Sequence, residues 1–408
     1  MNRKQLRKIF SDTYYTRLSG TPEELKTAEY LAECCRAYGA KARLEPFDVD
    51  MADIESASLT ADGVSIPCKG YRLSGCGSVT APFAYLPSLD PASLAQVRGK
   101  KVMIDGYLGI FAYKDIAEAG AAGFITYDGN VHYKDSDIDQ RTLRPYVSNG
   151  VKTLGVNINA KDAAKLVRQA PAEVTISIQQ KEYVSQSHNV VAEIPGCSDE
   201  WIVFTAHYDT TSLSLGPWDN MSGCVGLLGI MEALSKEAPL RYGLRFIFCG
   251  SEESGLLGSK EYAAKHESEL EKVALNINLD MIGCTMGKFI AVVSAEEKLV
   301  DFIKYYCSIE GWGIQARLGV YSSDSTPFAD KGVPALSFAR IATPNQATIH
   351  NRYDTMAVMS MEQMQKDIEF LAGFSMTMAN AVKCPVGREM PEKIKTELDE
   401  YLGRKRKE

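Results

Sequence analysis

The stretch WIVFTAHYDTTSLSLGPWDN, residues 201–220, joins a short apolar run to a loop that contains glycine, proline and acidic residues. The apolar run has the length and composition of a buried strand. His207 and Asp209 follow at its carboxyl end, and Asp219 lies further along the loop. In an open α/β sheet, ligands bind beyond the carboxyl ends of the strands. The stretch therefore predicts an imidazole and carboxylates at a sheet edge, where they are well placed to hold a metal ion.

From about residue 187 onward, apolar runs of strand length alternate with segments of helical periodicity. This order is typical of a mostly parallel sheet with helices on both faces. We therefore predict an α/β fold with a mixed, mostly parallel sheet flanked by helices. The expected strands are 188–194, 201–207, 241–250, 272–281, 288–294 and 334–339, and the expected helices are 222–237, 254–267, 296–311 and 360–382.

Residues 53–183 have a different texture. Short alternating or β-branched segments are separated by Gly, Pro and Asp, and helices are expected near 113–121 and 161–169. Such a pattern indicates a smaller α/β domain of mainly short strands. We predict that it is inserted into a larger domain formed by residues 1–52 and 184–408.

A further helix is predicted at residues 21–39. Thr21 and Glu24 have the spacing of a capping box, Pro22 occupies the first helical position, and Gly39 ends the segment. Small and apolar residues at helical spacing form its expected buried side.

Composition excludes several classes of partner. The chain of 408 residues has a net charge of -7, which disfavours a nucleic acid or an anionic membrane. No run of about 18 apolar residues suggests a membrane span, and the basic start lacks the apolar core of a secretory signal. Ten cysteines without a CxxC pair suggest reduced thiols. We therefore expect a cytoplasmic protein, with a homodimer as the default assembly.

Five residues with metal-binding side chains fall at predicted strand ends or in loops. Their oxygen and nitrogen donors suit zinc, and also manganese or cobalt. Two histidines and three carboxylates are more than one catalytic zinc needs, whereas a carboxylate shared between two metals would use all of them. These five residues are His207, Asp219, Glu253, Asp280 and His350.

Each of these residues also has an ordinary structural explanation. A histidine at a strand end is commonly a hydrogen-bonding residue, an aspartate in a loop commonly forms a turn, and Glu252 with Glu253 would stabilise the start of the following helix. The coincidence favours the metal site, because the chain has only five histidines and two of them lie beside acidic motifs.

Neighbouring carboxylates suggest a division of labour. One member of the pair Glu252 and Glu253 can bind metal while the other accepts a proton from water, since a general base must not be consumed as a ligand. Asp209, two residues beyond His207, is expected to accept the second ring N–H of that histidine. Asp354 is expected to do the same for His350, four residues before it.

Five motifs in this order resemble the co-catalytic di-zinc aminopeptidase family, which includes bacterial leucyl aminopeptidases and relatives of glutamate carboxypeptidase and glutaminyl cyclase. The motifs are HYD at 207–209, PWDN at 217–220, GSEESGLLGS at 250–259, NLDM at 278–281 and IHNRYDT at 349–355. RLSGTPEE at 17–24 resembles the opening segment of the family. Residues 99–129 resemble the protease-associated domain that many members carry as an insertion.

The resemblance implies a role for each ligand. One zinc ion would be held by His207, Asp219 and Asp280, and the second by Asp219, Glu253 and His350, with Asp219 bridging. Glu252 would be the general base and then the acid that protonates the leaving amine. Peptides would be the substrates, shortened from their N-termini.

Two departures from the family pattern concern substrate contacts. Several members have a tyrosine before the last histidine, where this chain has Ile349, so Tyr321 or Tyr353 is expected to replace it. A Ser-Asp-His pattern before a phenylalanine is replaced here by Ser323, Asp324 and Ser325. Asp324 is therefore also a candidate substrate contact.

Alternative functions remain open from the sequence. A carboxypeptidase or small-amide hydrolase would need cations for the substrate carboxylate, and Arg340 and Arg352 flank His350. Their ordinary alternative is a structural ion pair. Cyclisation of N-terminal glutamine belongs to single-zinc relatives, and a binding scaffold would have lost its ligands. The complete ligand set disfavours both.

Overall fold

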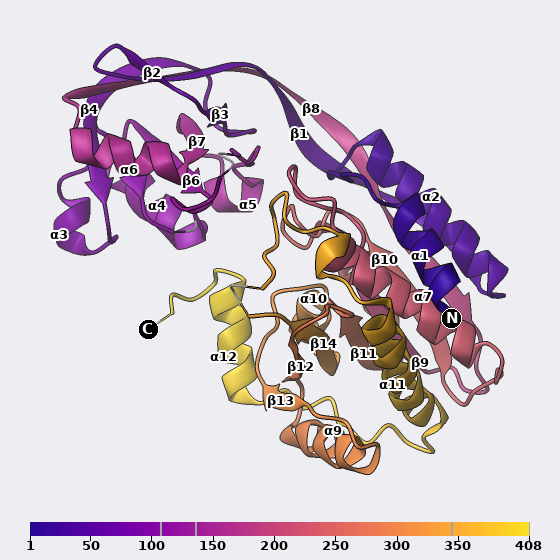
Figure 1. Cartoon of the computed structure of the whole chain (residues 1–408). Helices are drawn as coiled ribbons and strands as arrows, with labels where there is room; N and C mark the ends of the chain where they lie inside the picture. The colour runs from indigo at the N-terminus through magenta and orange to yellow at the C-terminus, as the bar shows by residue number, and fades with distance from the viewer. Residues whose placement is uncertain (107, 135–136, 344–345, 408) are drawn as a thin grey trace. The chain divides into compact units, whose positions relative to one another are not determined.

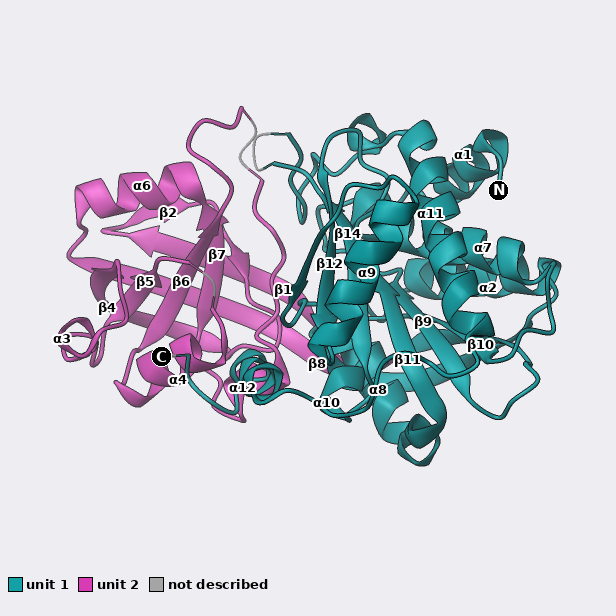
Figure 2. Cartoon of the chain, turned by 90° about the horizontal axis from the view of Figure 1, so that it is seen from below, with its two compact units in different colours: residues 1–49, 186–408 teal, residues 50–185 magenta. Residues whose placement is uncertain are grey.

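The computed structural model describes residues 1–106, 108–134, 137–343 and 346–407, and its elements are labelled in Figure 1. The chain divides into two compact units, unit 1 of residues 1–49 and 186–408 and unit 2 of residues 50–185 (Figure 2). The insertion predicted at 53–183 begins three residues later and ends two residues earlier than unit 2.

Unit 1 is built on a mixed sheet with the strand order β13-β12-β14-β11-β9-β10-β8. The pairs β9/β10, β9/β11, β11/β14 and β12/β13 are parallel, and β8/β10 and β12/β14 are antiparallel. This confirms the predicted α/β fold with a mostly parallel mixed sheet. The strands are β8 (Glu173–Ile194), β9 (Trp201–His207), β10 (Gly243–Cys249), β11 (Val273–Leu279), β12 (Lys288–Ser294), β13 (Gln315–Leu318) and β14 (Ala335–Ile341).

Helices cover both faces of this sheet (Figures 1 and 2). Side chains alternate across the strands, so Ile202 and Phe204 of β9 join the larger apolar cluster while Val203 joins the cluster on the other face. The larger cluster includes α1 (Arg3–Asp12), α2 (Pro22–Ala37), α7 (Ser222–Leu234), α9 (Glu297–Ile309) and α11 (Met361–Asn380), and the other includes α8 (Leu257–Lys265), η2 (Glu267–Lys272) and α10 (Ser325–Asp330).

Besides the short helix α10, two helices of unit 1 were not predicted. Asn2 and Gln5 form a capping box at the start of α1, and its Leu6, Ile9 and Phe10 are buried. Helix α12 (Glu392–Tyr401) buries only Ile394 and Leu398, against residues at α10 and β14. Both segments are so rich in charged residues that their few apolar positions gave a weak helical pattern.

Two strands are far longer than the sequence suggested. β1 (Lys41–Ala61) and β8 each contain one of the two chain crossings between the units, and they pair with each other. The middle of β8 contains the exposed residues Glu182, Tyr183 and Val184, without the regular alternation of a half-buried strand. Pairing with a distant segment stabilises this part, and no local pattern records such pairing.

Unit 2 is a smaller α/β unit. Strands β4/β5, β5/β6 and β6/β7 pair in parallel, whereas β3/β7 and β4/β8 are antiparallel. Its other elements are β2 (Val64–Ile66), β3 (Lys69–Gly70), β4 (Gly77–Leu86), β5 (Lys101–Ile104), β6 (Gly123–Asp128), β7 (Gly155–Asn159), α3 (Pro91–Leu94), α4 (Ile110–Glu118), α5 (Pro145–Ser148) and α6 (Ala160–Gln169).

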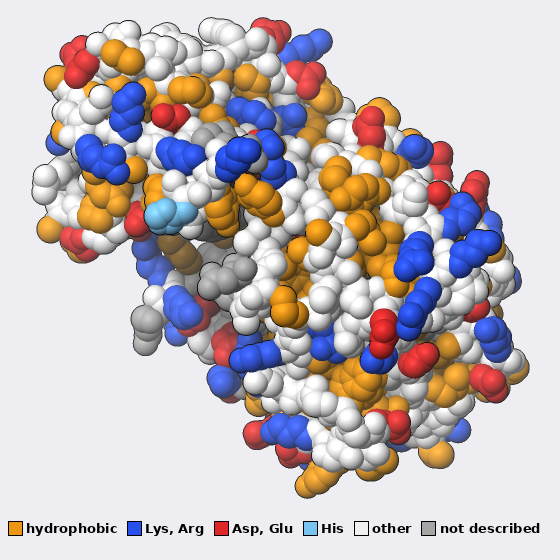
Figure 3. Space-filling model, viewed as in Figure 1, with side chains coloured by type: hydrophobic (Ala, Val, Ile, Leu, Met, Phe, Trp, Pro, Cys, Tyr) orange, Lys and Arg blue, Asp and Glu red, His pale blue; other side chains and the backbone are white. Residues whose placement is uncertain are grey.

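The surface carries charges of both signs, and Figure 3 shows Lys and Arg side chains interspersed with Asp and Glu over the visible face. Among the described helices, none has both the length and the apolar composition that a membrane crossing requires. The cytoplasmic location and the homodimer stay predictions.

An aromatic cluster between the sheet and α11 provides a test of the core of unit 1. Phe338 on β14 is fully buried, and its ring centroid lies 5.3 Å from that of Phe374. We expect Phe338→Ala to lower the free energy of unfolding by about 3–5 kcal/mol, because it leaves a cavity. Chemical denaturation measures the change. The control Tyr305→Ala changes a side chain that is 73% exposed, and its free energy of unfolding should stay within about 0.5 kcal/mol of the parent value. An equal loss of stability in the two variants would contradict the burial of Phe338 in the core.

Candidate metal centre

The parallel strands bring three of the predicted ligands to one edge of the sheet. His207 is the last residue of β9 and lies opposite Cys249, the last residue of β10. Glu253 follows β10 by four residues, and Asp280 directly follows β11. Because these strands run in the same direction, their carboxyl ends meet and the side chains beyond them converge.

Asp219 comes from the loop between β9 and α7. It lies in η1 (Pro217–Met221), where its φ of −106° and ψ of 94° interrupt the helical geometry. The carboxylate of Asp354 accepts the backbone N–H groups of Trp218 and Asp219, both at 3.2 Å. The hydroxyl of Ser214 also donates to this carboxylate, at 3.1 Å. The loop is therefore held from behind at the position of the ligand.

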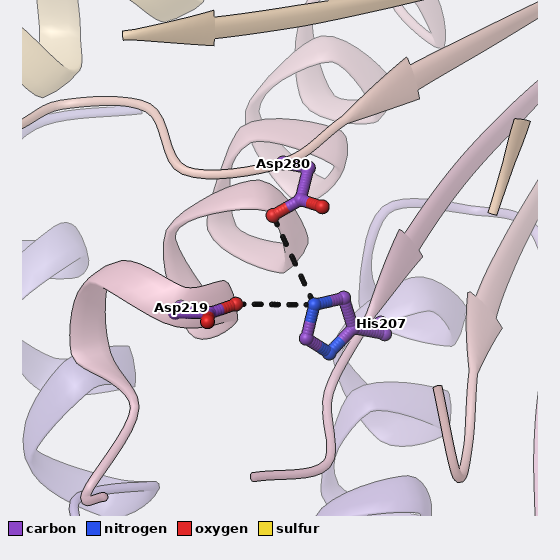
Figure 4. Close-up of side chains that lie close together, drawn as sticks. All are labelled: His207, Asp219 and Asp280. Carbon is purple, nitrogen blue, oxygen red and sulfur yellow. Dashed lines mark ion pairs between the residues drawn. The ribbon is translucent and has the colours of Figure 1, made fainter. Parts of the chain in front are cut away.

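The five predicted ligands form two groups that share Asp219. In the first, His207 Nε2 lies 3.2 Å from Asp219 Oδ1 and 3.8 Å from Asp280 Oδ1. Figure 4 shows both carboxylates directed at this ring nitrogen. In the second group, His350 Nε2 lies 3.1 Å from both Asp219 Oδ2 and Glu253 Oε1. Asp219 thus presents one carboxylate oxygen to each group, which is the geometry of a bridging ligand.

These spacings fit zinc. Donors 2.0–2.1 Å from a tetrahedral ion lie about 3.3 Å from one another, close to the four distances above. Within each group the donor atoms all lie within 4.8 Å of one another. Asp280 Oδ1 is buried and has no hydrogen-bond donor among the described residues. A cation would satisfy that oxygen, since a buried carboxylate without a partner is costly.

Glu252 lies beside the first group without belonging to either group of described ligands. Its Oε2 is 3.9 Å from His207 Nε2. The backbone N–H groups of Glu252 and Glu253 donate to the two carboxylate oxygens of Asp209, at 2.9 and 3.0 Å. Asp209 therefore fixes the turn that carries both glutamates, a role that the sequence analysis did not anticipate.

Asp209 also lies behind His207, with Oδ1 3.4 Å from the ring Nδ1. His207 Nδ1 forms no hydrogen bond with the described residues, so acceptance of its N–H by Asp209 stays a prediction. Both residues are buried.

The charges in the site shift the titration of its members. Burial raises the pKa of Glu252 well above its usual value, and the negative charge of Glu253 adds to the effect. Burial alone would lower the pKa of His207, but the carboxylates of Glu252, Asp209 and Asp219 raise it well above 6.5. Burial alone would also lower the pKa of His350, but the carboxylates of Glu253 and Asp219 raise it well above 6.5.

Comparison with known proteins agrees with this geometry. Residues 189–374, which contain all five predicted ligands, match the model of peptidase family M28. Over this part of its length the chain is similar to that family.

Individual relatives match this chain over different lengths. It is 27% identical over 376 residues to aminopeptidase YwaD of Bacillus subtilis, across 87% of this chain and 80% of the relative. It is 26% identical over 235 residues to leucine aminopeptidase 1 of Metarhizium robertsii, across 52% of this chain and 59% of the relative, less than two thirds of its length. The fold matches BSAP, a zinc aminopeptidase from Bacillus subtilis, with a TM-score of 0.76 and 24% identity across 92% of this chain and 95% of that chain.

Two predicted roles of side chains, those of Arg340 and Asp354, require correction. Arg340, a candidate substrate contact, forms an ion pair with buried Asp367 and also donates to the Gly287 carbonyl. Asp324 is fully buried, and burial raises the pKa of its carboxyl to about 6; its role as a substrate contact stays a prediction. Asp354 supports the backbone of Asp219, where the sequence analysis assigned it to His350.

The two tyrosine candidates have different surroundings. Burial raises the pKa of Tyr321 well above its usual value, and the nearby charges of Asp280 and Asp219 contribute, so its ring lies beside the ligands. Tyr353 is 38% exposed and follows His350 in the same loop.

Asn220 is a supporting residue that the sequence analysis quoted in PWDN without assigning a role. Its side chain accepts the N–H groups of Gly223 and Met281, and donates to the carbonyl of Leu279. It therefore joins the loop of Asp219 to the end of β11, which carries Asp280. Its position next to a predicted ligand was the available signal.

The raised pKa values of the two histidines predict that metal binding depends on pH. Zinc binds the neutral imidazole, so each histidine must lose its proton before it can bind. As the pH falls through the raised pKa values, the apparent zinc affinity should drop by about tenfold per pH unit for each proton released. Chelator competition at several pH values between 6 and 8 measures this dependence. Equal affinities across that range would contradict the electrostatic description of the site.

Proposed function

We propose that this protein is a peptidase of family M28, a zinc-dependent aminopeptidase that binds two zinc ions and removes N-terminal residues from peptides. The observation that carries the proposal is the pair of ligand groups that share Asp219, with Glu252 beside them. The similarity to aminopeptidase YwaD and leucine aminopeptidase 1 supports the assignment. Mn²⁺ or Co²⁺ also suits these donors.

The metal ligands divide into two sets around the bridging carboxylate. His207 and Asp280 would complete one set, and Glu253 and His350 the other. Zinc bound there would polarise the scissile carbonyl and make water a nucleophile near neutral pH. Tyr321, whose raised pKa keeps its phenol protonated, would donate a hydrogen bond to the developing oxyanion.

Glu252 would move the proton. Its raised pKa makes it a better base near neutral pH than an ordinary glutamate. It would accept a proton from the attacking water and deliver it to the leaving amine. Asp209 would keep the carboxylate in place through the backbone N–H groups of residues 252 and 253.

The charge of the site supports an aminopeptidase over a carboxypeptidase. With two zinc ions bound, the charges of the three ligand carboxylates and Glu252 would be balanced, whereas a substrate carboxylate would need an additional positive partner. One of the two arginines considered for that purpose, Arg340, is bound to Asp367. Retention of both ligand groups also supports a hydrolase over a binding scaffold or a single-zinc cyclase.

Unit 2 would act as the protease-associated insertion suggested by its sequence, limiting substrate size or mediating self-association. Its α/β composition is compatible with that assignment.

Metal analysis followed by a substrate comparison tests the proposed reaction. We expect about two zinc ions per chain, and hydrolysis of aminoacyl-anilides with a free α-amine. An N-blocked dipeptide with a free C-terminus should be a poor substrate, because it lacks the free α-amine of an aminopeptidase substrate. Preference for the blocked dipeptide would establish the carboxypeptidase alternative, and a chain without bound metal would favour the scaffold.

The neighbouring glutamates form a matched pair for mutation. Glu252→Gln should retain two zinc ions and lose about 10²- to 10⁴-fold in kcat, because only proton transfer is removed. Glu253→Gln changes the adjacent residue by the same chemistry and should instead weaken metal binding. Measurement of zinc content and kcat for both variants distinguishes the roles. Near-parental turnover of Glu252→Gln would refute its assignment.

A further inference from the structure

The segment that precedes α2 places a fully buried arginine beneath the candidate metal centre. Arg17 is 0% exposed. Its guanidinium donates to the backbone carbonyls of Thr13 and Tyr15 in its own segment, at 2.7 and 2.8 Å. A buried cation requires such partners, because water no longer solvates it.

The guanidinium of Arg17 also reaches both ends of the loop that separates His207 from Asp219, with Nη1 shared among three carbonyls. Nε donates to the carbonyl of Tyr208 at 2.6 Å. Nη1 and Nη2 donate to the carbonyls of Leu215 and Gly216, at 2.8 and 3.0 Å. One rigid guanidinium plane therefore joins Tyr208, which follows His207, to Leu215 and Gly216, which lie shortly before Asp219.

The backbone of the same segment follows this loop. Arg17 N–H donates to the Thr210 hydroxyl at 2.9 Å, and Thr210 N–H donates to the Arg17 carbonyl at 3.1 Å. A Cβ added at Gly216, where φ is +57°, would lie 2.7 Å from Arg17 Nη2. The loop and the guanidinium are thus in close contact without room for a larger residue at 216.

Electrostatics connects Arg17 to the two carboxylates that support the ligand-bearing turns. Asp209 and Asp354 are close enough to interact with its charge. Asp209 accepts the backbone N–H groups of Glu252 and Glu253. Asp354 accepts the backbone N–H of Asp219. Arg17 is therefore the cation that faces both of these supports.

We propose that Arg17 is a positioning residue that sets the separation of His207 and Asp219, and so the geometry of the shared metal site. The effect of this positioning on catalysis rests on the proposed function. A lysine at this position has one compact ammonium group, which cannot reproduce the planar fork that reaches Tyr208 and Gly216 together. Arg17 touches neither substrate nor metal ligand side chains, and acts through the loop backbone.

The test compares Arg17→Lys with Arg245→Lys. Arg245 is also buried, and pairs with Glu193 and Glu269, away from the ligand loop. Both variants should lower the melting temperature of the metal-free protein. Only Arg17→Lys should weaken zinc binding, by roughly 10- to 100-fold, and change the visible absorption spectrum of the cobalt-substituted protein.

Zinc affinity and a cobalt spectrum equal to those of the parent in Arg17→Lys would overturn the proposal. If circular dichroism shows that Arg17→Lys is unfolded, the zinc affinity and cobalt spectrum of Thr210→Val test the proposal instead. This variant removes the hydroxyl that accepts the Arg17 N–H and preserves side-chain shape, and it should cause a smaller change in the same direction. An unchanged zinc affinity and cobalt spectrum in folded Thr210→Val would overturn the proposal as well.

Failure of the proposed function has a different signature. A parent protein that binds two zinc ions without hydrolysing peptides would refute the aminopeptidase assignment. The metal readouts for Arg17 would still decide whether it positions the site.

Discussion

Mutual repulsion of buried carboxylates is the constraint on which the candidate site depends. Asp219, Glu253, Asp280 and Glu252 crowd around two imidazoles, and burial together with the charge of Asp219 raises the pKa of Asp280 to about 7. Like charges so close in a poorly solvated site disfavour ionisation of all of them together. Divalent cations reverse this balance, so metal binding would also stabilise the folded chain.

The fold meets this constraint with backbone hydrogen bonds in addition to side-chain contacts. Parallel strands deliver His207 and Asp280 to one sheet edge, while the remaining ligands come from loops without a regular hydrogen-bond ladder. Two further carboxylates, Asp209 and Asp354, hold those loops through N–H groups of residues 252, 253 and 219. The acidic character of the region therefore extends beyond the ligands into the groups that orient them.

Sequence patterns predicted the parts of the structure that depend on local order. Apolar runs that end in His207 and before Asp280 marked parallel strand ends, and the site followed from their common direction. The ion pair of Arg340 with Asp367 joins residues 27 positions apart, and the contacts of Arg17 and Asp354 span even longer separations. Burial of Asp324 likewise depends on packing of several elements. None of these has a periodic signal, although the motif RLSGTPEE marked the segment that carries Arg17.

An anomalous difference map from crystals of the zinc-loaded protein, recorded at the zinc absorption edge, tests the central claim most directly. The account predicts two peaks about 3.5–4 Å apart, one on each side of the Asp219 carboxylate, with His207 at one and His350 at the other. A single peak, or zinc bound away from Asp219, would contradict it.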